Sequence, residues 1–155
     1  MLNILDVARY LLSLGPMNHK KLQKICYYIQ AWHLAFTGEP LIDTEFQAWA
    51  HGPVSPVLYQ AYREWGGLTI PKITYEQYNL NIPEKFKTFI KAVYELYKKY
   101  TADELEFFTH KESPWIDARG DVPEGQPCKN VIPNDSIKNF YKGYITNDNN
   151  SNTNK

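Results

Sequence analysis

The sequence predicts an α+β fold that is predominantly α-helical, a compact single domain of about seven helices with a small β-hairpin. Two observations lead to this expectation. Apolar residues recur at helical spacing over most of the chain, whereas only one short stretch alternates between apolar and polar residues. The 155 residues fit one domain with a sizeable core. Aromatic residues make up 15% of the chain, which favours a packed core over disorder.

The first two helices are expected at residues 3–13 and from Asn18 to the Gly-Glu-Pro sequence that follows residue 37. Asn18 is expected to cap the second helix, with Met17 and Leu22 forming a hydrophobic staple. This second helix is apolar around its whole girth, which predicts a central position with neighbours on several sides. The first helix carries one apolar stripe, formed by Ile4, Val7, Ala8, Leu11 and Leu12.

The middle of the chain predicts the β-structure. Residues 44–50 alternate and are expected to form a short strand, followed by a rigid turn over residues 51–56. Within this turn, Ser55 and Pro56 have the order of an N-cap and a first-turn proline, which predicts that another helix starts there. A second strand, paired with the first and confined to an edge by Pro71, is compatible with the apolar residues that follow this helix. These are Leu68, Ile70, Ile73 and Tyr75.

Three further helices are expected in the C-terminal half. The clearest helical periodicity spans residues 83–100. Thr101 and Glu104 have the spacing of a capping box, which starts the next helix. Ser113 and Pro114 then repeat the cap-then-proline signal and predict a short helix.

The end of the chain contains one more helix and a polar tail. Residues 120–133 are rich in proline and glycine and are expected to form a loop. Asn134 or Asp135 is expected to cap the last helix. Residues 146–155 are almost wholly Asn, Ser, Thr and Asp, so we expect a disordered tail behind a domain of residues 1–145.

Composition and charge exclude several classes of function. Seventeen basic residues balance 17 acidic ones, so the positive excess typical of nucleic-acid binding is missing and no nucleic-acid partner is expected. Cys26 and Cys128 predict neither a disulfide framework nor a zinc site, and the histidines lack metal-ligand spacing, so no metal or cofactor is expected. Without an apolar run of membrane-spanning length or a signal peptide, we expect a cytoplasmic protein with no membrane partner.

Catalysis by cysteine or histidine has a competing structural interpretation. Cys26 and His33 are seven positions apart on the second helix, and such a pair can act as nucleophile and base. Two helical turns separate them by about 10 Å, however, and a cysteine among Ile and Leu is typically buried and inert. His51, fixed by the Gly-Pro that follows it, is either a positioned contact or acid–base residue or a structural side chain that pins the turn. Its neighbour Ser55 is better explained as a helix cap.

A second dense cluster of charged and aromatic residues lies at positions 109–115. Its His110, Glu112 and Trp115 suit a binding surface, because Trp is a favoured anchor in interfaces. In the alternative interpretation, Ser113 caps a helix and Trp115 belongs to the core. Both interpretations stay open, and together these features are more typical of a protein-binding module than of an enzyme.

Three segments of the chain resemble the Panacea domain family, also described as SocA-like or phage-associated GepA-like proteins. They are LQKICYYIQAWHLAFTGEPLI at 22–42, FQAWAHGPVSPVLY at 46–59 and LEFFTHKESPWIDAR at 105–119. The likeness continues in order from about residue 2 to residue 144. The resemblance implies a compact, mostly helical antitoxin, encoded beside a toxin gene in a bacterial or phage genome, that neutralises its toxin by direct binding.

The expected function is therefore a non-enzymatic antitoxin whose partner is a toxin protein from a neighbouring gene. One alternative is a proteolytic adaptor that delivers the toxin to a host protease, as described for a SocA-like branch, and another is a small Cys/His hydrolase. The residues expected to form the toxin-binding surface are Trp49, His51, Pro53, Val54, Ser55, His110, Glu112 and Trp115.

Overall fold

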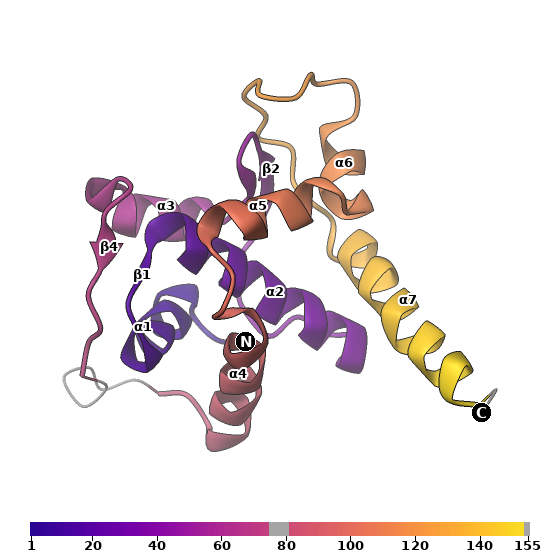
Figure 1. Cartoon of the computed structure of the whole chain (residues 1–155), viewed down its shortest axis with the longest axis horizontal. Helices are drawn as coiled ribbons and strands as arrows, with labels where there is room; N and C mark the ends of the chain where they lie inside the picture. The colour runs from indigo at the N-terminus through magenta and orange to yellow at the C-terminus, as the bar shows by residue number, and fades with distance from the viewer. Residues whose placement is uncertain (75–80, 154–155) are drawn as a thin grey trace.

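The computed structural model describes residues 1–74 and 81–153, with side chains described as far as residue 146. The described residues form seven α-helices, one short 3-10 helix and two small antiparallel sheets (Figure 1), which confirms the predicted fold class. In chain order the elements are α1 (Ile4–Leu14), β1 (Met17–Asn18), α2 (His19–Thr37), β2 (Gln47–Trp49), β3 (Gly52–Val54), α3 (Pro56–Tyr62), η1 (Arg63–Trp65), β4 (Thr69–Ile70), α4 (Glu84–Tyr97), α5 (Ala102–His110), α6 (Ser113–Arg119) and α7 (Asn134–Thr153).

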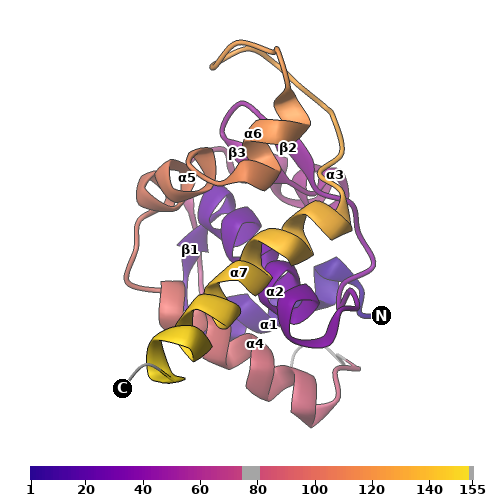
Figure 2. The same cartoon turned by 90° about the vertical axis from the view of Figure 1, so that its right-hand side faces the viewer.

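Helix α2 lies at the centre of the molecule, as its apolar girth predicts. α7 crosses one side of it, α1 and α4 lie below it, and α5, α6 and the β2–β3 hairpin gather above it (Figures 1 and 2). Leu22, Ile25 and Ile29 lie on one side of α2 and Tyr27 on another, and each has none of its surface exposed to solvent. Contacts on several sides explain why this helix has no polar face.

The predicted helix starts are confirmed by the capping hydrogen bonds. Asn3 Oδ1 accepts from the amide of Leu5 at 2.8 Å, and Asn18 Oδ1 accepts from the amide of Lys21 at 2.9 Å. Thr101 forms the predicted capping box, in which both reciprocal bonds are present. The five residues of the predicted apolar stripe in α1 are also the five that are buried there.

The pairing of the strands differs from the prediction. β4 pairs with β1, with Met17 opposite Ile70, so the expected pairing of this region with residues 46–50 is wrong. β2 pairs instead with β3, and residues 52–54, predicted to belong to a turn, are a strand. Local pairing prevails because the chain reverses within two residues, helped by a φ of +106° at Gly52. Tyr75, also assigned to the predicted strand, lies outside the described residues.

The last two helices begin and end at different residues from those predicted. Glu112 occupies the N-cap of α6, and Ser113 is the first residue inside the helix rather than its cap. α7 runs to Thr153, past the expected end of the last helix, and residues 154–155 lie outside the described part. Its backbone hydrogen bonds continue from a first half that is packed on α2 and α6. The disordered tail expected at 146–155 and the domain boundary at residue 145 stay predictions.

Buried glutamines of α2 hold the connecting segments against the helix. Gln30 Oε1 accepts from the amides of Leu41 and Ile42, both at 2.9 Å, and its Nε2 donates to the carbonyl of Ile42 at 3.0 Å. Two turns of α2 nearer its start, Gln23 bonds both the amide and the carbonyl of Ser55. Each side-chain amide therefore bonds backbone groups of the segments that connect the elements. No helix of the described residues has the length and apolar character that a membrane crossing requires.

Replacing Gly52 with alanine is expected to lower the free energy of unfolding by about 2 kcal/mol or more. The backbone there has a positive φ, and an added Cβ would lie 2.6 Å from Lys24 Cε and 2.9 Å from Thr109 Oγ1. Gly38→Ala is the matched control, because Gly38 has a φ of +81° but no atom within 4 Å of an added Cβ. It should cost about 1 kcal/mol. Equal losses in urea unfolding would contradict the role of the close approach at Gly52.

Candidate partner-binding surface

The β2–β3 hairpin, α5, α6 and the loop at 120–133 lie together at one end of the molecule (Figure 1). All eight residues predicted to bind a toxin come from this end, although they differ in exposure. The side chain of His51 is 78% exposed at the hairpin tip, and Trp49 and His110 are partly buried. The remaining five are buried: Pro53, Val54, Ser55, Glu112 and Trp115.

Two of the buried residues have structural roles that the sequence analysis considered. Ser55 is the N-cap of α3: its Oγ accepts from the amide of Leu58 at 3.4 Å and is bonded to Thr44 Oγ1 at 2.6 Å. Trp115 donates its indole N–H to the carbonyl of Trp49 at 2.8 Å, and its ring stacks on His110 with 4.0 Å between centroids. The capping interpretation of Ser55 and the core interpretation of Trp115 describe these contacts.

Arg119 fixes the hairpin to the loop at 120–133, a role that no sequence pattern indicated. Its guanidinium is buried against the ring of Trp115 and donates to the carbonyls of Ala48, Pro123 and Gln126 at 2.7 to 2.9 Å. Three carbonyls satisfy much of the donor fork of the arginine. The hairpin and the loop are therefore held in one arrangement by this side chain of α6.

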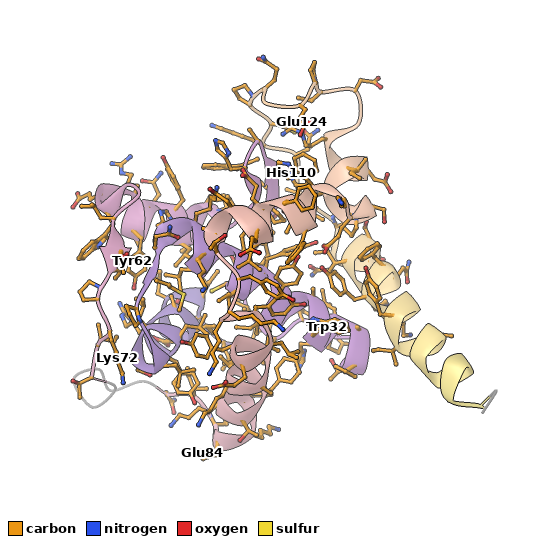
Figure 3. The ribbon with its side chains drawn as sticks, viewed as in Figure 1. Trp32, Tyr62, Lys72, Glu84, His110 and Glu124 are labelled. Atoms are coloured by element: carbon orange, nitrogen blue, oxygen red, sulfur yellow. The ribbon has the colours of Figure 1, made fainter. Side chains whose placement is uncertain are left out.

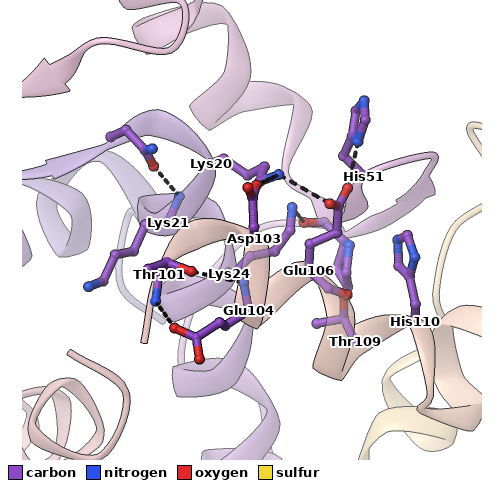
Figure 4. Close-up of polar contacts among 12 residues, drawn as sticks. Lys20, Lys21, Lys24, His51, Thr101, Asp103, Glu104, Glu106, Thr109 and His110 are labelled. Atoms are coloured by element: carbon purple, nitrogen blue, oxygen red, sulfur yellow. Dashed lines mark hydrogen bonds and ion pairs between the residues drawn. The ribbon is translucent and has the colours of Figure 1, made fainter. Parts of the chain in front are cut away.

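Lys24 supports the hairpin from the side of α2. Its side chain is buried, and Nζ donates to the carbonyl of Pro53 at 3.1 Å (Figure 4). Burial, reinforced by the positive charge of Lys20 and only partly opposed by Glu106, lowers the pKa of Lys24 to about 7. A lysine on a helix is normally expected to face solvent, so its sequence position did not reveal this role.

A charged network surrounds the hairpin tip (Figure 4). Glu106 lies 2.5 Å from His51 Nδ1 through one oxygen and 3.2 Å from Lys20 Nζ through the other, and Lys20 also contacts Asp103 at 2.7 Å. Burial alone would raise the pKa of Glu106, but its bonds to His51 and Lys20 outweigh that effect and lower it. The network joins the hairpin, α2 and α5, so three elements present one charged rim.

Two hollows flank the hairpin tip. The larger, of about 270 Å³, is almost wholly apolar and lies between Trp49, Val54 and the loop residues Gly125 to Lys129. The smaller, of about 170 Å³, is bounded by the polar side chains of α2. We call the accessible side chains around these hollows the hairpin surface, which comprises Lys20, Trp49, His51, Glu106 and Lys129.

Glu112 faces a different part of the molecule, an aromatic pocket of about 460 Å³ between α2, α5 and α7. Its carboxylate accepts from the hydroxyl of Tyr28 at 3.0 Å and from that of Tyr141 at 2.5 Å. Burial raises the pKa of Glu112 to about 7, although the hydroxyls of Tyr141 and Tyr28 oppose part of that rise. Glu112 therefore does not share a surface with His51, even though both were predicted to bind the same partner.

The residues considered for catalysis are poorly arranged for it. The thiol of Cys26 is buried, and burial raises its pKa, which disfavours the reactive thiolate. His33 Nδ1 lies 2.7 Å from the carbonyl of Glu39, so its ring is engaged at the end of α2. His51 is positioned by Glu106, and its neighbour Ser55 is buried as a helix cap. Within residues 1–74 and 81–153, no three His, Cys, Asp or Glu side chains gather as metal ligands.

These features define a small, mostly helical domain built around one buried helix, with a rigid hairpin and an aromatic pocket at its surface. The model of the family described as "Antitoxin SocA-like, Panacea domain" matches residues 22–116, and the chain belongs to this family. "Antitoxin SocA" of Caulobacter vibrioides (strain NA1000 / CB15N) is 38% identical to the chain over 47 residues, which are 30% of this chain and 25% of that protein. The chain thus aligns with about a quarter of that relative's length. No solved structure matches the chain significantly.

The family match confirms the resemblance that the sequence segments indicated. It begins inside α2 and ends inside α6, so it contains the hairpin and all eight residues predicted to bind a toxin. Membership of this family supports an antitoxin role.

Lys24→Met is expected to stabilise the protein most near about pH 7 and least near about pH 10. The pKa of Lys24 falls from 10.5 to about 7 on folding, so between these values the unfolded chain binds more protons and wild-type stability rises with pH. The methionine variant lacks that dependence. The amount by which its free energy of unfolding exceeds that of wild type should therefore shrink by a few kcal/mol between about pH 7 and pH 10. Urea titrations of both proteins measure the difference. Lys20→Met, whose lysine has a raised pKa, is the control that should show no such change.

Glu112→Gln is expected to change how the free energy of unfolding depends on pH between about pH 4 and pH 8. The pKa of Glu112 rises from 4.5 to about 7 on folding, so the folded chain binds more protons in this range and wild-type stability falls as pH rises. The glutamine variant should lack this fall, which amounts to about 3 kcal/mol at most. Unfolding free energies between about pH 4 and pH 8 test this. A wild-type profile parallel to that of the variant would contradict the burial of a titrating carboxyl.

Proposed function

We propose that the chain neutralises a cognate toxin in the cytoplasm by binding it directly through the hairpin surface, and that a neighbouring gene encodes this toxin. The observation that carries the proposal is the match to an antitoxin domain family over residues 22–116, which contain the hairpin, α5 and the start of α6. The curated relative is itself named an antitoxin. The proposal adds a mechanism to the antitoxin role, namely contact between two folded surfaces.

The hairpin surface suits a protein partner because it is ordered before binding. Arg119 and Trp115 bond the backbone of the hairpin from α6, and Lys24 bonds it from α2. A surface whose backbone is already fixed loses little conformational entropy when a partner binds. Of the buried residues predicted for the site, Pro53 and Trp115 thus belong to the support of the surface, while Trp49 and His51 contact the toxin.

The two kinds of side chain around the tip have different roles in this proposal. The apolar hollow beside Trp49 takes an aliphatic or aromatic side chain of the toxin, which supplies most of the binding energy. The polar side chains of the hairpin surface set the orientation of the partner and raise the rate of association. They are Lys20, His51, Glu106 and Lys129.

Co-expression with the product of the adjacent open reading frame tests the function. Restored growth together with a stable, co-purified complex supports direct neutralisation. Restored growth with no complex and a disappearing toxin would instead assign the chain to the proteolytic adaptors. A partner that shows neither rescue nor complex contradicts the proposal for that gene product.

The paired substitution His51→Ala and Lys129→Ala is expected to weaken toxin binding by about tenfold or more. Both side chains are exposed at the hairpin surface, so the fold should be little affected. The matched control is Lys72→Ala with Glu84→Ala, two exposed residues at the opposite end of the molecule (Figure 3). Titration calorimetry with the purified toxin compares the two variants. Equal affinities in the two would place the contact elsewhere.

A further inference from the structure

The aromatic pocket between α2, α5 and α7 has a composition that the hairpin surface does not explain. Its volume is about 460 Å³, and rings from several helices form its walls. The rings of Tyr28 and Tyr97 are stacked with their centroids 4.1 Å apart, and Trp32 donates its indole N–H to Tyr97 Oη at 2.8 Å. The other aromatic lining residues are Tyr100, Phe108, Phe140, Tyr141 and Tyr144.

A carboxylate without a counter-ion lies in this aromatic wall. Glu112 is 8% exposed and lines the pocket, and within the described part of the chain no cationic side chain forms an ion pair with it. Tyr141 donates to one of its oxygens and Tyr28 donates to the other. Each carboxylate oxygen can accept a further hydrogen bond, so both remain available to a donor that enters the pocket.

The cation nearest in sequence is directed to another ring. Lys111 also lines the pocket, but its Nζ lies 4.0 Å from the ring centroid of Phe107, an exposed residue at the rim. Its charge is therefore engaged in a cation–π contact rather than in neutralising Glu112. The interior of the pocket therefore holds a carboxyl group without a counter-ion among aromatic rings.

We propose that this pocket binds the guanidinium group of an arginine side chain presented by a protein partner. A guanidinium is planar and stacks on aromatic faces, and its parallel N–H groups match the two oxygens of a carboxylate. The pocket supplies both features, through the partly exposed rings of Trp32, Tyr97 and Tyr100 and through Glu112. An anionic group would instead meet the carboxylate and the negative faces of the rings.

The inference deepens the proposed function, since the protein partner would be the toxin. It adds a second contact on a different side of the domain from the hairpin surface, and it names the chemistry of that contact. Burial raises the pKa of Glu112 because it disfavours the charged carboxylate. A guanidinium bound in the pocket would stabilise that charged form, so the raised pKa is consistent with the proposed ligand.

The pocket can be tested without any toxin. The probe is the peptide acetyl-Gly-Arg-Gly-amide, and the matched control peptide carries citrulline, which has the shape of arginine but no charge. The indole N–H of Trp32 at the pocket wall provides an NMR signal that should shift saturably with the arginine peptide. The citrulline peptide should bind about tenfold more weakly or not at all. Equal binding of the two peptides would overturn the proposal.

Two substitutions with opposite expected effects make the test specific. Glu112→Gln keeps the shape of the side chain and should weaken arginine binding by about tenfold or more, whereas Lys111→Gln removes a rim cation and should strengthen it. Lys111 is exposed, so this variant remains informative even if Glu112→Gln fails to fold. Unchanged affinity in a folded Glu112→Gln variant, or weaker binding by Lys111→Gln, would contradict the assignment.

The toxin complex then tests the source of the arginine. Glu112→Gln should weaken toxin binding, and one toxin arginine replaced by glutamine should weaken it no further in that variant. A toxin that binds wild type and Glu112→Gln equally would overturn the assignment to this partner. A chain that binds the peptide but neutralises no toxin would refute the proposed function separately, because the peptide experiment does not depend on it.

Discussion

The structure depends on one constraint: most of α2 is buried, so the polar side chains that it buries must find partners inside the protein. Those partners are the segments that connect the other elements. Gln30 bonds the segment after α2, Gln23 bonds the start of α3, and Lys24 bonds the strand before it. Because a buried polar group without a partner costs more than an exposed one, these bonds fix where the loops lie. The central helix is therefore both the core of the domain and the support for its loops.

The same constraint explains why the hairpin is a firm surface although it consists of two three-residue strands. An isolated hairpin of this size is marginal in water. Here Lys24 and Gly52 allow it to lie directly against α2, while Arg119 and Trp115 hold its other side through backbone carbonyls. Buried ionisable groups reduce stability relative to apolar side chains of the same size. Their presence under a candidate binding surface is consistent with a role in fixing its shape.

The candidate site could be predicted in part. Resemblance and unusual turn residues directed attention to the hairpin and to the start of α6, and the structure brings these segments to one end. The sequence could not separate contact residues from supporting residues, because Trp115 and Ser55 have the same chemistry in either role. Arg119 and Lys24 were missed since charged residues on helices usually face solvent. Glu112 was predicted for the same surface as His51, but the helical turn at α6 directs it into the aromatic pocket instead.

The sequence by itself determined the helices, most of their caps and the central place of α2. These features depend on residues within one or two turns of each other, so local patterns are sufficient to define them. Only the tertiary structure decided which short strands pair, which aromatic residues remain accessible and where the buried charges lie. Strand pairing between Met17 and Ile70, and the approach of Glu112 to Tyr28 and Tyr141, join residues distant in the chain. Such contacts follow from the packing of whole helices, which the pattern of any single segment does not contain.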